Sequence, residues 1–133
     1  MSRFIIAMLI LTLLAGCSLI SDSGPEIDSF IIAVDGITAP DTMRVGDTLT
    51  VYLDGFIGPD GCYYFSHFEE TLTPSSADLT VWGRHRLGGL CTDALVYLDG
   101  RPWSVRTEHS GTYRIRIVRP DGSALDHSVT VVE

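Results

Sequence analysis

Tyr113-Arg114-Ile115-Arg116-Ile117 alternates apolar and charged side chains at every step. Successive side chains of a β-strand point to opposite faces, so this pattern predicts a strand with one buried face and one face in water. The stretch Thr48-Leu49-Thr50-Val51-Tyr52-Leu53 has the same period of two. Both stretches therefore predict strands that cover a hydrophobic core on one side.

Short segments elsewhere in the chain predict further strands, over residues 27–34, 62–68, 79–82, 95–98 and 129–131. Gly and Pro residues separate them, as expected for turns. Segment 92–100 is also compatible with a short helix capped by Thr92, but its Val and Tyr residues and the β-rich surroundings favour a strand. About seven short strands predict an all-β, two-sheet sandwich over residues 26–133.

Ser110-Gly111-Thr112-Tyr113-Arg114-Ile115 resembles the start of strand F of an immunoglobulin-like domain, and Gly46-Asp47-Thr48-Leu49-Thr50-Val51 resembles the start of strand B. The resemblance implies that the tyrosine hydroxyl hydrogen-bonds to the backbone a few residues upstream. Ile115, and Val51 or Leu53, occupy the positions of the cysteines that join these strands in antibody domains. The resemblance thus implies an immunoglobulin-like sandwich with apolar packing in place of that bridge, and it names no activity.

The first 17 residues have the features of a secretory signal. Arg3 precedes an apolar run over residues 4–14, and small residues then lead to Cys17. The sequence Leu14-Ala15-Gly16-Cys17 resembles a bacterial lipobox, which implies cleavage before Cys17 and attachment of acyl chains to it. A transmembrane helix needs about 20 apolar residues, and this run is roughly half that length. A cleaved signal with an incidental cysteine is the remaining alternative.

These features divide the chain into a removed signal peptide (1–16), a lipidated tether (17–25) and one β-sandwich domain (26–133). Several acyl chains hold a protein stably on a bilayer, so the resemblance implies permanent membrane anchoring in the cell envelope. Ser18 follows the cysteine where some lipoproteins carry an aspartate that retains them in the inner membrane. We therefore expect the outer membrane in preference to the inner membrane.

The chain contains three cysteines, and an odd thiol in an exported protein requires an explanation. If Cys17 carries lipid, Cys62 and Cys91 remain as one pair in an oxidising compartment. Zinc usually takes four ligands at close spacing, and the four histidines are scattered along the sequence without metal-ligand spacing. We expect a Cys62–Cys91 disulfide and no metal or other cofactor.

The charge of the chain restricts its partners. The formal net charge is −8, and all nine basic residues are arginines. Proteins that bind nucleic acid neutralise phosphates with basic side chains, so this composition argues against nucleic acid as a partner. The absence of lysine from the sequence excludes Schiff-base lysines, Ser–Lys dyads and a P-loop lysine.

The titratable residues show no catalytic pattern. Ser110 follows His109, but neighbouring residues of a strand point to opposite faces, and no Gly-x-Ser-x-Gly motif occurs. The protein is expected not to be an enzyme. Four aspartates stand beside glycines or in turns, which favours a role in turn formation, with calcium binding as the alternative. The histidines are His67, His85, His109 and His127, and the aspartates are Asp54, Asp60, Asp99 and Asp121.

Five residues are the candidates for a binding surface. Arg114 and Arg116 share the outward face of one predicted strand, where they can contact an anionic partner or pair with acidic residues of adjacent strands. Trp82, Tyr97 and Trp103 belong to the less regular segment 82–103 and can stack on sugars, anchor a protein partner or pack in the core.

The sequence as a whole predicts a membrane-anchored envelope lipoprotein with a non-catalytic binding or assembly role through an immunoglobulin-like domain, with an envelope protein or glycan as the partner. The alternative is a carbohydrate- or peptidoglycan-binding module.

Overall fold

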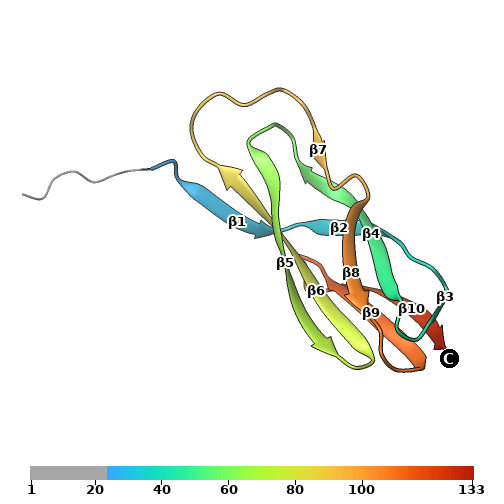
Figure 1. Cartoon of the computed structure of the whole chain (residues 1–133). Helices are drawn as coiled ribbons and strands as arrows, with labels where there is room; N and C mark the ends of the chain where they lie inside the picture. The colour runs from blue at the N-terminus through green and yellow to red at the C-terminus, as the bar shows by residue number, and fades with distance from the viewer. Residues whose placement is uncertain (1–23) are drawn as a thin grey trace, which may run out of the picture.

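The computed structural model describes residues 24–133, and these form an all-β sandwich of two sheets (Figure 1). The predicted signal peptide and lipidation site at Cys17 lie outside the described residues. No helix long and apolar enough to cross a membrane occurs within residues 24–133. The strands are β1 (Ile27–Ile31), β2 (Ala33–Thr38), β3 (Thr42–Arg44), β4 (Thr48–Gly58), β5 (Tyr63–Thr73), β6 (Ser76–Arg86), β7 (Val96–Tyr97), β8 (Arg101–Arg106), β9 (Gly111–Val118) and β10 (Ala124–Val132).

Sheet A has six strands and is built around β6. Strand β5 pairs with β6 along nearly its whole length. Strand β1 pairs with residues 82–86 of β6, and β9 pairs with residues 76–80, so β1 and β9 share the other edge of β6. Strand β10 then pairs with β9, and β3 pairs with β10. Sheet B has four strands, with β2 on one edge of β4 and with β8 and β7 on the other.

The predicted strand over residues 27–34 is divided between the two sheets. Strand β1 belongs to sheet A and β2 to sheet B, and Figure 1 shows the chain passing from one to the other. Ile32 lies at the crossing, where its side chain is buried and its backbone N–H donates to the carbonyl of Val81 at 2.8 Å. The continuous apolar run within residues 27–34 suits this path, because a residue that crosses between two sheets is covered on both sides and does not point to solvent.

The core consists of the inward side chains of both sheets. Leu49, Val51 and Leu53 of β4 face Ile115 and Ile117 of β9, and all five are fully buried. Apolar packing therefore stands where antibody domains have an intersheet bridge, as expected. Close-packed interiors of this kind tolerate few voids, which fixes the spacing of the two sheets.

The pairing of β6 with β9 is parallel, whereas the sheets of immunoglobulin domains are described as antiparallel. The upstream hydrogen bond expected for the Tyr113 hydroxyl is also not formed. Tyr113 is buried on the inner face of β9, and its hydroxyl has no hydrogen-bond partner among the described residues. The side chain belongs to the hydrophobic core, and the charge of Glu70 acts on its hydroxyl.

Residues 24–133 form ten strands, more than the seven or so expected. The division of the first strand adds one, and the short strand β3 adds another. Strand β8, which contains Pro102, is the third additional strand. Proline cannot donate a ladder hydrogen bond, but it is tolerated in an edge strand such as β8. The segment expected over residues 95–98 is a strand of only two residues, β7.

Candidate functional site

The outer surface of sheet B carries three large exposed aromatic side chains. Strand β4 buries Val51, Leu53 and Ile57 and turns Tyr52 and Phe56 outward, so that 46% and 44% of these residues remain exposed. Tyr97 of the neighbouring strand β7 is 53% exposed, and its ring meets that of Phe56 edge to face, with the ring centroids 5.5 Å apart. We call Tyr52, Phe56 and Tyr97 the aromatic face.

Asp54 lies between Tyr52 and Phe56 on the same side of β4. Its Oδ1 accepts a hydrogen bond of 2.8 Å from the backbone N–H of Gly100, which fixes the carboxylate at the surface of the sheet. The sequence predicted a turn at Asp54-Gly55, but both residues lie inside β4. Gly55 allows β4 to approach β2 closely, since a Cβ there would come within 2.6 Å of the carbonyl oxygen of Ala33.

A shallow hollow of about 400 Å³ adjoins the aromatic face beside Phe56. Arg119 crosses from the end of β9 to sheet B, where its Nε donates to the carbonyl oxygen of Val34 at 3.0 Å. The hydroxyl and backbone N–H of Ser123 donate to Asp121 and hold the pKa of that carboxyl below its ordinary value, an effect to which the charge of Arg119 adds. The hollow is lined by Ala33, Val34, Asp35, Phe56, Arg119, Pro120 and Asp121.

The five binding candidates chosen from the sequence do not form one surface. Tyr97 belongs to the aromatic face of sheet B. Trp82, Arg114 and Arg116 belong to sheet A, on the side opposite its buried residues. Trp103, which the sequence left open between surface and core, is 5% exposed and lies in the core.

Trp82 and Arg114 already have partners within the chain. The indole Nε1 of Trp82 donates to Glu69 Oε2 at 2.7 Å, and its ring stacks near that of His67. Arg114 forms an ion pair with Asp126 of the adjacent strand β10, at 3.1 Å between Nη2 and Oδ1. This is the cross-strand pairing with an acidic residue that the sequence allowed as the alternative to an anionic partner.

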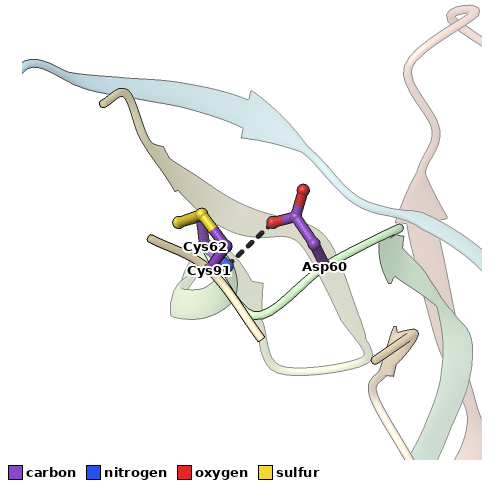
Figure 2. A group of neighbouring side chains, drawn as sticks. All are labelled: Asp60, Cys62 and Cys91. Carbon is purple, nitrogen blue, oxygen red and sulfur yellow. Dashed lines mark hydrogen bonds between the residues drawn. A yellow bond between two sulfur atoms is a disulfide. The ribbon is translucent and has the colours of Figure 1, made fainter. Parts of the chain in front are cut away.

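Cys62 and Cys91 form a disulfide, as predicted (Figure 2). With Asp60 they make the one cluster of potential metal ligands found within residues 24–133. The two sulfur atoms are bonded to each other and are no longer thiolates, which are the form that binds metal. Asp60 Oδ1 accepts a hydrogen bond of 2.9 Å from the backbone N–H of Cys62, so its visible role is to shape the turn.

Two residues of the aromatic face were missed in the sequence. The alternation that identified residues 48–53 continues through Asp54 and Phe56, but the Asp-Gly pair, typical of turns, ended the predicted strand too early. Extending the period of two by three residues would have placed Phe56 on the same outward side as Tyr52.

Comparison of the chain with protein-family models, with curated proteins and with solved structures finds no match.

Proposed function

We propose that this protein is a bacterial envelope lipoprotein, anchored by lipid on Cys17, that binds another envelope component through the aromatic face. The observation that carries the proposal is the exposure of Tyr52, Phe56 and Tyr97 together on one side of one sheet. Contiguous exposed apolar surface marks interaction sites in soluble domains, and aromatic side chains dominate the energetics of protein interfaces.

The aromatic face can supply substantial binding free energy. An aromatic side chain buries about 150–250 Å² when fully covered, and close to half of that surface is exposed at each of the three residues. At about 25 cal/mol per Å², covering one of these rings is worth about 2 kcal/mol. The hollow beside Phe56 adds a place where a partner side chain can insert.

The positions of the histidines support a non-catalytic role. His67 stands beside Trp82, His85 stacks on the ring of Tyr63 with 3.9 Å between centroids, and His127 is paired in register with buried Ile115. Nucleophilic catalysis needs a base within hydrogen-bond reach of the nucleophile and a third group that orients the base. Ser66 Oγ and His67 Nδ1 lie 2.9 Å apart on an exposed surface, but no third side chain among the described residues hydrogen-bonds to His67.

The proposed anchor places the domain close to the bilayer. The eight residues that follow Cys17 span at most about 27 Å when fully extended. The partner is therefore expected at the membrane surface, with the outer membrane preferred.

A neutral glycan is the second candidate, because rings exposed on the flat side of a sheet are suited to stacking on sugar rings. The carboxylate of Asp54, held between two of these rings, offers a hydrogen-bond acceptor for sugar hydroxyls.

The test is photo-crosslinking of the full-length chain in the cells that express it. A photoreactive phenylalanine analogue replaces Tyr52 or Phe56, and the control carries it at Tyr64, a 39% exposed tyrosine of sheet A. We expect one dominant protein adduct from the first two positions and none from the control. Glycan fragments in place of protein would favour the second candidate, and equal labelling from all three positions would refute the aromatic face. Intact-mass analysis of the same sample measures the lipid on Cys17.

A further inference from the structure

The groups around the aromatic face are predominantly acidic. Asp54 projects from β4 between two of the rings, and Asp35 lines the hollow beside Phe56. Asp99 is exposed in the turn that follows Tyr97, next to Gly100, whose N–H holds the Asp54 carboxylate. The chain as a whole has a net charge of −8, so the rest of the chain carries no net positive charge that would neutralise these carboxylates.

Arg119 is the one basic residue that lines the hollow. Its Nε donates a hydrogen bond to the carbonyl oxygen of Val34, and its positive charge helps to lower the pKa of Asp121, which lines the same hollow. Arg106, further along the outer side of sheet B, forms an ion pair with Glu108 at 3.4 Å. The carboxylates of Asp35 and Asp54 have no ion-pair partner among the described residues. They therefore give the surface around the aromatic face a negative charge.

From this arrangement we infer that the partner is a basic peptide segment, whose Lys or Arg side chains bind between the rings and carboxylates of the aromatic face. The inference rests on the proposed function and names the chemistry of its ligand. A cation over the face of an aromatic ring is attracted by the ring electrons, and a carboxylate next to the ring adds a charge-assisted hydrogen bond. Tyr52, Asp54 and Phe56 offer both kinds of contact along one strand.

The spacing of these groups fits an extended segment. Outward positions along a strand recur every two residues, which is about 6.7 Å. The side chains of an extended peptide recur at the same interval, so basic residues at alternate positions would meet the ring, carboxylate and ring of β4 in turn.

The test measures binding of two synthetic octapeptides to the full-length chain in vesicles of neutral phosphatidylcholine. One peptide has Lys and Arg at alternate positions, and the other has Glu at the same positions. We expect saturable binding of the basic peptide alone, weakened by added salt as surface charge interactions are.

Matched variants separate this site from general attraction to an acidic protein. Asp54→Asn keeps the acceptor for the Gly100 N–H and removes one charge, and Asp78→Asn removes one charge from the exposed side of sheet A. We expect Asp54→Asn to weaken binding by about threefold, as for an exposed ion pair. Tyr97→Leu should weaken it by about two- to fivefold, the range of an exposed cation–π contact, and the control Tyr64→Leu should leave it unchanged.

Equal weakening by Asp78→Asn and Asp54→Asn would overturn the inference, because net charge alone would then explain the binding. Equal binding of the acidic peptide would overturn it as well. The crosslinking experiment of the proposed function distinguishes the two claims. A neutral or acidic segment captured by the aromatic face would remove this inference and leave the binding function in place.

Discussion

Trp103 and Glu70 connect the two sheets. The buried indole of Trp103, on β8 of sheet B, donates from Nε1 to Oε2 of Glu70, on β5 of sheet A, at 2.7 Å. Glu70 is in register with Leu79, a fully buried residue of β6, so it lies on the inward side of an edge strand. A charged residue turned inward at an edge discourages pairing with further strands, and here the same residue also serves a buried donor.

Removal of the Glu70 carboxylate should destabilise the domain, because it leaves the Trp103 indole N–H without a partner. We expect Glu70→Ala to lower the free energy of unfolding by about 1–3 kcal/mol, and Glu70→Gln, which retains an acceptor, to lower it by less. Denaturant unfolding measures both. The control is Glu69→Ala, which frees the partly exposed indole of Trp82, where water replaces the lost acceptor. A loss as large in the control as in Glu70→Ala would contradict this account.

Tyr113→Phe should stabilise the protein. The hydroxyl of Tyr113 is buried and has no hydrogen-bond partner among the described residues, so its removal relieves a desolvation cost. We expect a gain of about 1 kcal/mol in the free energy of unfolding. Tyr64→Phe, at an exposed site, should change the stability little. A clear loss of stability in Tyr113→Phe would show that the hydroxyl makes a bond after all.

The stability should fall at alkaline pH. Burial raises the pKa of Tyr113 above its ordinary value of 10.0, and the charge of Glu70 raises it further. Above pH 10 the unfolded chain releases the phenolic proton while the folded chain retains it, so the free energy of unfolding decreases as the pH rises. Below pH 10 Tyr113 is protonated in both the folded and the unfolded chain, so it does not make the free energy of unfolding depend on pH. Urea unfolding between pH 8 and 11 measures the effect, and Tyr113→Phe should show a shallower decrease than the unaltered protein.

Loss of the Cys62–Cys91 disulfide should cost much of the stability of the domain. The two cysteines are 29 residues apart in the sequence, and closing a loop of that length is worth about 3.5 kcal/mol in the chain-entropy model. The double variant Cys62→Ala/Cys91→Ala is compared with the unaltered protein, each with and without reductant. Reductant should destabilise only the unaltered protein. A double variant as stable as the oxidised protein would contradict the prediction.

Gly83→Ala should destabilise the packing of β1 on β6. A Cβ at this position would lie 2.6 Å from Cζ of Phe30, whose ring packs over the glycine. Because overpacking of a dense interior typically costs about 1–3 kcal/mol, we expect a loss in that range by thermal or denaturant unfolding. Gly24→Ala, where a Cβ meets nothing within 4 Å, is the control and should have no effect.

The sequence predicted the fold class, the core of β4 and β9, and the disulfide, because these depend on local periodicity and cysteine count. It did not predict the parallel pairing of β6 with β9, which depends on how distant strands meet. It also treated Asp54-Gly55 as a turn. The pair lies within β4 because β2 passes so close to Gly55 that a side chain has no room there, a tertiary constraint that overrides the local preference.

The binding candidates show the same contrast between what local alternation predicts and what contacts between distant strands decide. Alternation placed Arg114 and Arg116 outward, where the structure has them. The two tryptophans could not be assigned from the sequence, since β8 was not predicted and the inward side of Trp103 was therefore unknown. The structure buries Trp103 in the core and places Trp82 on the outer side of sheet A.

The crossing of the chain at Ile32 has a mechanical consequence. A pull on the chain ahead of residue 27 first loads β1, which is held along its length by five register pairs to β6. Beyond Ile32 the same pull passes into β2 and thereby into the other sheet. Force applied at the N-terminus is therefore borne first by sheet A, and β1 would have to separate from β6 before β2 and sheet B carried the load.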